Sequence, residues 1–181
     1  MSKCMKYPFV IFDRDGTLIE SVHHLVDSKS VRIKPEIYSC LIRLKRENFK
    51  FGMITNQSVI SRGMASLSQV EDINKIIMTS LEPLGITFDF VYICPHLPTQ
   101  GCICRKPKTE FGIRAIRDHG VLPEASFMVG DQDSDMAFAK RVGFLAVQIT
   151  SGQEVSDLAD YSSSTLENVA SWIIQNKNMG A

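Results

Sequence analysis

The chain has 181 residues, of which 44% are hydrophobic, and its 20 basic residues balance its 20 acidic residues. This length suits a single domain, residues 1–181, and the neutral charge argues against a nucleic-acid binder that depends on bulk charge. No run of about 18 apolar residues suggests a membrane span, and the N-terminal MSKCMKYPF lacks the apolar core of a signal peptide. We therefore expect a cytoplasmic protein whose five cysteines are reduced or bound to metal rather than paired as disulfides.

Short apolar runs alternate with helical patterns along the chain. The predicted strands are Tyr7–Phe12, Phe49–Thr55, Phe88–Cys94, Ser126–Val129 and Leu145–Thr150. Helices are predicted near residues 35–48, 68–84, 109–119, 133–142 and 165–177. Ser68 with Glu71 predicts a capping box for the second helix, and Thr165 predicts a cap for the last. Because strands separated by helices form right-handed βαβ units, this order predicts an α/β fold with a parallel sheet and helices on both faces.

Polar side chains stand at the ends of three predicted strands. Asp13 and Asp15 follow the first strand, Thr55 and Asn56 end or follow the second, and Asp131 follows the fourth. Ligands of open α/β sheets bind beyond the carboxyl ends of the strands, so these groups should meet there. The alternative for Asp13 and Asp15 is that they only cap a glycine-containing turn.

Three carboxylates at one edge would form a site of hard oxygen ligands. Mg²⁺ prefers such a site and completes its coordination with water and substrate phosphate. A bound cation would make Asp13 a workable nucleophile toward an anionic phosphate. Asp15 could protonate the leaving oxygen and later take a proton from water. Thr55 and Lys106 could bind the phosphoryl oxygens, so the pattern indicates hydrolysis of a phosphomonoester through an aspartyl-phosphate.

Four segments resemble the motifs of the haloacid dehalogenase superfamily of phosphohydrolases. They are FDRDGT at 12–17, ITNQ at 54–57, RKP at 105–107 and VGDQDSD at 129–135, in order across nearly the whole chain. The resemblance implies a Rossmann-like sheet, a nucleophile at Asp13 and a general acid and base at Asp15. It also implies that Mg²⁺ is held by Asp13, the Asp15 main-chain carbonyl and Asp131, with Asp135 as a supporting acid. The short spacing between motifs is typical of members without a large cap domain.

The stretch CPHLPTQGCICRKP, residues 94–107, contains a second candidate metal site. Cys94 with His96 and Cys102 with Cys104 form two short pairs around a five-residue loop. Three thiolates and one imidazole make a closed structural zinc set, and such soft ligands favour zinc over magnesium. The alternative is a loop of reduced cysteines with a surface histidine. Bacterial phosphatases of heptose bisphosphate and of histidinol phosphate have a zinc loop that this stretch resembles, which implies structural Zn²⁺ near Arg105.

Two loops indicate different substrates. TNQSVISRG, residues 55–63, resembles the D-glycero-D-manno-heptose 1,7-bisphosphate 7-phosphatases, whereas the short zinc loop is more similar to the histidinol-phosphate enzymes. Residues 20–29, with His23 and His24, match neither group, and Val59 and Gln132 also depart from the usual patterns. The Arg-Gly pair at 62–63 favours the heptose. The candidate substrate contacts are Asn56, Gln57, Arg62 and Arg105.

The sequence thus predicts a Mg²⁺-dependent phosphatase of carbohydrate metabolism that acts on a small phosphorylated metabolite as a monomer. Histidinol phosphate is the alternative substrate. A polynucleotide 3′-phosphatase is disfavoured because it needs a basic groove for the DNA backbone, and the chain is neutral. A non-catalytic binding module is disfavoured because every catalytic residue of the motifs is present.

Overall fold

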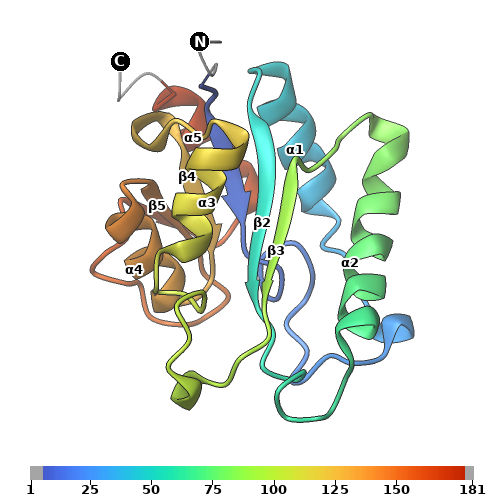
Figure 1. The fold of residues 1–181 in the computed structure, drawn as a ribbon. Coiled ribbons are helices and arrows are strands. Elements are labelled where there is room, and N and C mark those ends of the chain that lie inside the picture. Colours follow the sequence, from blue (N-terminus) through green and yellow to red (C-terminus); the bar gives the residue numbers. More distant parts are fainter. Residues whose placement is uncertain (1–5, 178–181) are drawn as a thin grey trace.

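The computed structural model describes residues 6–177. A sheet of six parallel strands runs through the molecule in the order β3-β2-β1-β4-β5-β6 (Figure 1). The strands are β1 (Phe9–Phe12), β2 (Lys50–Asn56), β3 (Phe90–Cys94), β4 (Phe127–Gly130), β5 (Leu145–Ile149) and β6 (Tyr161–Ser163). The helices are α1 (Glu36–Arg46), α2 (Leu67–Leu81), α3 (Glu110–His119), α4 (Asp133–Val142) and α5 (Leu166–Gln175). The predicted α/β fold is confirmed.

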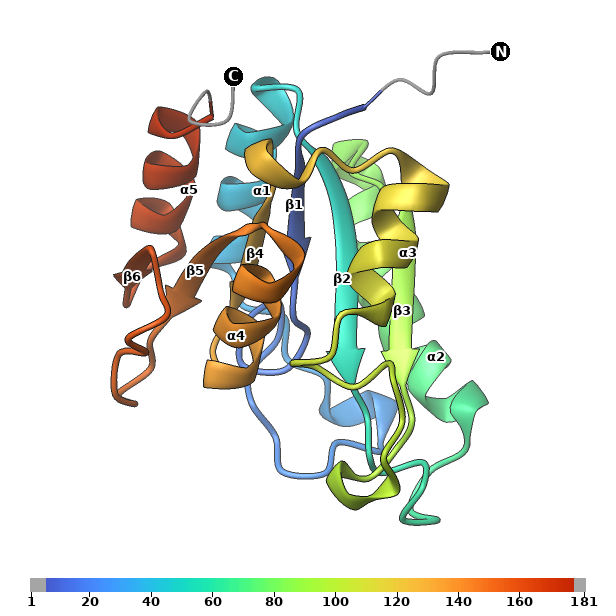
Figure 2. The same cartoon turned by 60° about the vertical axis from the view of Figure 1, so that its left-hand side comes forward.

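Helices cover both faces of the sheet, as Figure 2 shows. The helices α1, α2 and α5 contribute to the core on one face, together with Val10 and Phe12 of β1. The helices α3 and α4 contribute to the core on the other face, together with Phe9 and Ile11. Successive residues of a strand point to opposite faces, so a strand with a core on each side needs an apolar residue at every position. This is why FVIF, the whole of β1, is apolar and buried.

One edge of the sheet was not predicted from the sequence. The sequence did not predict β6, an edge strand of three residues. Its residues, YSS, are all only partly buried, so no apolar run marks the strand.

The predicted cap of the last helix is confirmed, because Thr165 Oγ1 accepts a hydrogen bond of 3.3 Å from the Asn168 amide.

The capping box of α2 lies two residues before the predicted one. Ser66 Oγ accepts from the Gln69 amide at 3.2 Å, and the Gln69 side chain accepts from the Ser66 amide at 2.8 Å. The helix therefore begins at Leu67, and the prediction of Ser68 with Glu71 as the capping box was wrong.

The loops that follow the strands gather at the lower edge of the molecule in Figures 1 and 2. Between β1 and α1 the described chain forms loops and one short 3-10 turn, and between β2 and β3 it adds only α2 and a second such turn. No cap domain therefore covers this edge within residues 6–177. In the same residues, no helix combines the length and the apolar character needed to cross a membrane.

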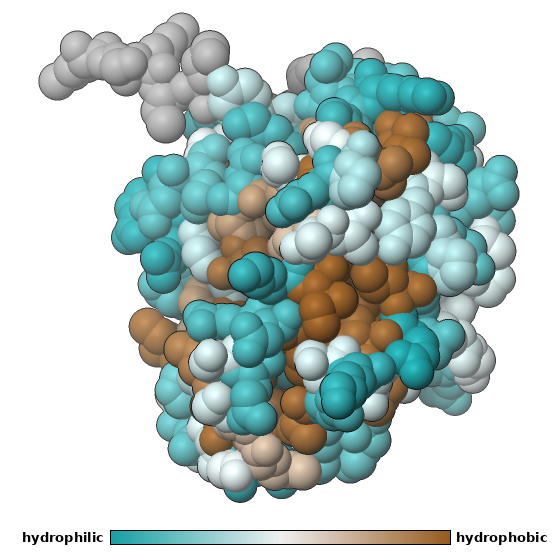
Figure 3. All heavy atoms as spheres, turned by 90° about the vertical axis from the view of Figure 1, so that its right-hand side faces the viewer, coloured by the Kyte–Doolittle hydropathy of each residue, from teal (hydrophilic) through white to brown (hydrophobic). Residues whose placement is uncertain are grey.

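The helix α2 stands at the right in Figure 1 and therefore faces the viewer in Figure 3. Exposed apolar side chains on α2 and on the turn after it include Leu67, Ile76 and Leu84. Hydrophobic areas interrupt the polar surface in the middle of this face. The carboxyl ends of the strands lie at the lower edge of the molecule instead.

Candidate active site

A cavity of about 240 Å³ opens at the carboxyl ends of the strands. Its lining comes from the end of β2, from the loops after β1, β3 and β4, and from the start of α4. The lining residues are Asp13, Asp15, Ser21, Thr55, Asn56, Arg105, Lys106, Asp131, Gln132, Ser134 and Asp135. All the residues predicted for catalysis, substrate contact and magnesium binding therefore line this cavity, except Gln57, which contacts Asp15 and Thr55 from outside the lining, and Arg62.

Lys106 is buried at the floor of this cavity. Its Nζ donates to Asp13 Oδ1 and to the Ile54 main-chain oxygen, each at 2.6 Å, and pairs with Asp135 Oδ1 at 2.7 Å. An ammonium group has three protons to donate, so these acceptors satisfy it. Burial alone would lower the pKa of Lys106, but Asp13 and Asp135 outweigh burial and raise it. The lysine therefore stays charged and fixes the Asp13 carboxylate.

The acid cluster fits a magnesium ion. Asp13, Asp131 and Asp135 each offer a carboxylate oxygen within 4.8 Å of the others. Both carboxylate oxygens of Asp135 have protein partners. One pairs with Lys106, and the other accepts from the Gln132 amide at 3.1 Å. Oδ1 of Asp131, in contrast, is buried and has no hydrogen-bond partner among residues 6–177. A buried carboxylate oxygen needs a partner, so the donor set fits Mg²⁺ held by Asp13 and Asp131.

The electrostatics of the cluster also favour a cation. Burial raises the pKa of Asp131, and the nearby charge of Asp13 adds to the shift. Burial raises the pKa of Asp135 to about 6. These carboxylates repel one another when they are charged. Gly16 allows Asp131 to pack against the turn after β1, because it has φ +80° and a Cβ there would lie 2.4 Å from Asp131 Oδ2. A bound cation would relieve the repulsion.

Asp15 lines the cavity and is held from two sides. Gln57 Nε2 donates to Asp15 Oδ2 at 2.6 Å and to Thr55 Oγ1 at 2.9 Å. Arg14 Nη2 lies 2.9 Å from the same Asp15 oxygen. Burial raises the pKa of Asp15 and Asp13 adds to the shift, although Arg14 and Gln57 oppose it. A carboxyl group with a raised pKa suits the donation of a proton.

Of the remaining predicted substrate contacts, some line the cavity and one does not. Asn56 Nδ2 donates to the Lys106 main-chain oxygen at 3.2 Å, and Asn56 Oδ1 accepts from the Lys106 amide at 3.1 Å. Arg105 lines the cavity and donates to the His96 main-chain oxygen at 3.1 Å. Arg62 is exposed and does not line the cavity. Of the two arginines, Arg105 is the one that faces the space for a substrate.

The loops of residues 20–29 and 55–63 meet beside this cavity. Val26 of the first loop packs against a small apolar cluster that includes Val59 of the second. His23 and His24 stack with ring centroids 3.9 Å apart. Slight desolvation and the neighbouring charges of His23 and Arg62 lower the pKa of His24. The two histidines therefore lie on the same side of the molecule as Arg62.

The four predicted zinc ligands converge in space. The sulfur of Cys94 lies 3.4 Å from that of Cys104 and 3.8 Å from that of Cys102. His96 Nδ1 lies 3.6 Å from the Cys94 sulfur and 3.3 Å from the Cys104 sulfur. Ligands at about 2.3 Å from a tetrahedral ion are about 3.7 Å apart, so the cluster has the dimensions of one zinc site.

Two thiols of this cluster, those of Cys94 and Cys104, hold their protons strongly, whereas the burial of Cys102 is outweighed by hydrogen bonds that lower its pKa. Burial and the neighbouring sulfurs raise the pKa of Cys104 to about 12, and burial raises the pKa of Cys94. Zinc binding would therefore displace protons from the thiols. The four cysteines within residues 6–177 form no disulfide, and the remaining one, Cys40, is buried in α1. Cys4 lies outside the described residues.

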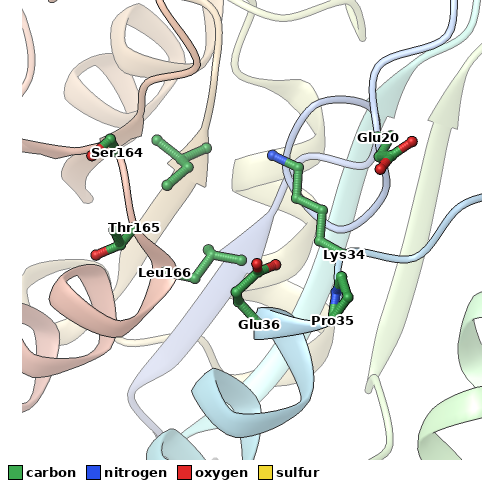
Figure 4. Close-up of a pocket in the computed structure, with 8 residues that line it drawn as sticks. Glu20, Lys34, Pro35, Glu36, Ser164, Thr165 and Leu166 are labelled. Atoms are coloured by element: carbon green, nitrogen blue, oxygen red, sulfur yellow. The ribbon is translucent and has the colours of Figure 1, made fainter.

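A second cavity, of about 310 Å³, lies between the loop after β1 and the starts of α1 and α5 (Figure 4). Its labelled lining residues are Glu20, Lys34, Pro35, Glu36, Ser164, Thr165 and Leu166. Lys34 Nζ donates to the Gly16 main-chain oxygen at 2.5 Å. Because Gly16 packs against Asp131, Lys34 supports the catalytic turn from outside the active site.

Sequence reasoning assigned no role to several residues of the site. Ser21, Gln132 and Ser134 line the cavity, and Arg14 contacts Asp15. One signal in the sequence could have indicated that α2 contacts a buried polar side chain such as that of Arg14. Asn74 occupies a buried position of α2 that the helical pattern reserves for apolar residues. A polar residue at such a position requires a buried partner.

The comparisons with known proteins agree with this geometry. A family model described as HAD-hydrolase-like matches residues 103–171. The D-glycero-beta-D-manno-heptose-1,7-bisphosphate 7-phosphatase of Helicobacter pylori is 34% identical over 128 residues, which are 70% of this chain and 74% of that protein. The histidine biosynthesis bifunctional protein HisB of Campylobacter jejuni is 33% identical over 142 residues. These cover 77% of this chain but 40% of HisB, so this chain spans about two fifths of that protein.

A solved structure shares the fold. It is the D,D-heptose 1,7-bisphosphate phosphatase from B. bronchiseptica in complex with magnesium and phosphate, and it matches with a TM-score of 0.83 at 24% identity. The match covers 93% of this chain and 99% of that one. Together with the identity to the Helicobacter pylori enzyme over most of both chains, this places the sequence motifs and the fold in one family. The chain belongs to the haloacid dehalogenase-like phosphatases.

Proposed function

We propose that this phosphatase removes the 7-phosphate of D-glycero-D-manno-heptose 1,7-bisphosphate through an aspartyl-phosphate on Asp13. The observation that carries the chemistry is the contact of Asp13 with Lys106 at the floor of the cavity, 2.6 Å between Oδ1 and Nζ. A carboxylate fixed in this way, beside an acid cluster that fits Mg²⁺, is placed to attack a phosphorus atom. Mg²⁺ held by Asp13 and Asp131 would neutralise charge between the attacking carboxylate and the phosphate.

The reaction would proceed in two steps. In the first, an Asp13 oxygen forms a bond to phosphorus, the bond from phosphorus to the C7 oxygen breaks, and Asp15 gives its proton to that oxygen. In the second, Asp15 takes a proton from water, the hydroxide oxygen bonds to phosphorus, and the bond to Asp13 breaks to release phosphate. Thr55 and Lys106 would bind the phosphoryl oxygens in both steps.

Two kinds of observation bear on the substrate, the identity to relatives and the pattern of two loops. The 34% identity to the Helicobacter pylori heptose enzyme and the Arg-Gly pair at residues 62–63 support the heptose bisphosphate. Histidinol phosphate is the second candidate, supported by the 33% identity to HisB and by the short zinc loop. The substrate is then a small phosphorylated metabolite in either case.

The expected result of a direct comparison is a higher kcat/KM for the heptose. Phosphate release with Mg²⁺ should be measured on heptose 1,7-bisphosphate, histidinol phosphate and a 3′-phosphorylated oligonucleotide. A preference for histidinol phosphate would show that the zinc loop is the better guide to the substrate. Similar weak rates on all three would contradict the heptose proposal and leave the phosphatase chemistry intact.

Asp131→Asn should weaken magnesium binding. The variant keeps the shape of the side chain but removes the charge of the carboxylate whose Oδ1 has no protein partner among the described residues. We expect the Mg²⁺ concentration for half-maximal activity to rise by roughly 100-fold, since even loss of a group that supports a metal ligand costs about 10- to 100-fold. Asp133→Asn is the matched control, because Asp133 is exposed and accepts from the Ser156 hydroxyl. An unchanged magnesium dependence in Asp131→Asn would exclude Asp131 as a ligand.

A further inference from the structure

Arg14 lies between the two catalytic aspartates in the sequence, yet its side chain points into the protein. The residue is 0% exposed. Its Nε donates to Asp15 Oδ2 at 3.1 Å, and its Nη2 donates to Asp15 Oδ1 at 3.1 Å. Because Nη2 also lies 2.9 Å from Oδ2, this edge of the guanidinium contacts both oxygens of Asp15, which restricts the orientation of the carboxylate as well as its distance.

The third nitrogen of Arg14 is anchored on a different element. Nη1 donates to Asn74 Oδ1 at 3.2 Å, and Asn74 belongs to α2, 60 residues further along the chain. Asn74 is itself buried, on the face of α2 that contributes Ile73 and Ile77 to the core. Arg14 therefore satisfies the side-chain oxygen of the buried Asn74, and α2 holds the far end of the guanidinium.

We propose that Arg14, anchored by Asn74, is a positioning residue that holds the Asp15 carboxylate in the orientation needed for proton transfer to the leaving group. The inference deepens the proposed function and depends on it, because it assigns Asp15 the acid role described above. Gln57 completes the arrangement from the other side with its bond of 2.6 Å to Asp15 Oδ2. Asp15 thus faces the cavity with both oxygens directed by neighbouring side chains.

A purely structural role would not require an arginine here. Replacing a buried ion pair by apolar side chains of similar volume is often neutral for stability or increases it. A lysine would supply the charge as a point donor but not the planar fork that sets the plane of the Asp15 carboxylate. The geometry therefore predicts that Arg14→Lys impairs proton transfer even though the positive charge is kept.

The test compares two kinds of leaving group. An alkyl ester needs a proton on its departing oxygen, whereas p-nitrophenyl phosphate loses p-nitrophenolate, which leaves without one. For Arg14→Lys we expect kcat/KM for an alkyl phosphate to fall by roughly 100-fold, the lower end of what general acid catalysis contributes, and kcat/KM for p-nitrophenyl phosphate to fall far less. The alkyl ester is whichever of heptose 1,7-bisphosphate and histidinol phosphate the wild-type protein hydrolyses, so an error in the substrate leaves the test intact.

A second variant keeps the test decisive if Arg14→Lys does not fold. Asn74→Leu keeps Arg14 but frees its Nη1, and it should produce a smaller loss with the same preference for the alkyl ester. Arg117→Lys is the matched control, because Arg117 pairs with Asp118 on the exposed surface of α3, and it should leave both rates unchanged. Equal losses on the two esters in the folded variants would overturn the positioning role. A wild-type protein that hydrolyses neither ester would instead overturn the proposed function.

Discussion

Asp13→Asn should abolish turnover and leave the fold intact. The amide of asparagine is a far weaker nucleophile than a carboxylate, so the bond to phosphorus does not form. We expect kcat to fall by roughly 10⁴-fold or more, since removal of a nucleophile leaves only the contributions of binding and electrostatics. Lys106 keeps two of its three acceptors, Asp135 and the Ile54 carbonyl, and the buried lysine therefore remains paired in the variant.

The measurement is steady-state phosphate release, together with a thermal melt to confirm the fold. Asp72→Asn is the matched control, because Asp72 is exposed on α2 and the same chemical change there should leave kcat unaltered. Activity close to that of the wild type in Asp13→Asn would remove Asp13 as the nucleophile. The contact of Lys106 with Asp13 and the acid cluster beside it would then need a role other than support of a nucleophile.

Cys104→Ser should release zinc and destabilise the protein. The Cys104 sulfur lies 3.4 Å from the Cys94 sulfur and 3.3 Å from His96 Nδ1, so it is a central member of the cluster. A structural zinc site contributes its binding free energy to folding, and we expect the free energy of unfolding to fall by roughly 3 kcal/mol or more. The zinc content of protein purified without added metal should fall from one ion per chain to a small fraction of that.

Cys40→Ala provides the control for cysteine removal. Cys40 is buried in α1 and lies outside the zinc cluster, so this variant loses some packing but should keep its zinc. Elemental analysis and thermal melts of the two variants separate loss of metal from loss of packing. Well-folded wild-type protein without zinc would contradict the predicted structural zinc site and favour a loop of reduced cysteines. The loss of zinc should also lower activity, because Arg105 and Lys106 follow directly after Cys104.

Most elements could be predicted from the sequence, but the start of α2 could not. Residues 66–71, SLSQVE, contain two overlapping capping patterns, Ser66 with Gln69 and Ser68 with Glu71. Each pattern places a serine three residues before a Gln or Glu, so the local sequence does not distinguish them. In the structure, the amides of residues 64 and 65 donate to the Val59 oxygen and close a turn directly before Ser66, so the helix begins there. The turn that precedes Ser66 thus selects one of two equally good capping patterns.

The sequence by itself determined the chemistry that we propose for this protein, because the residues predicted to carry it end or directly follow apolar strands of one parallel sheet. Asp13, Thr55 and Asp131 can be placed at one edge without knowing any side-chain contact. Only the tertiary structure decided how those groups are held. The contacts of Lys106 with Asp13 and of Arg14 with Asn74 join residues 93 and 60 positions apart. Such contacts depend on the loop after β3 and on the packing of α2 against the sheet, which no local pattern specifies.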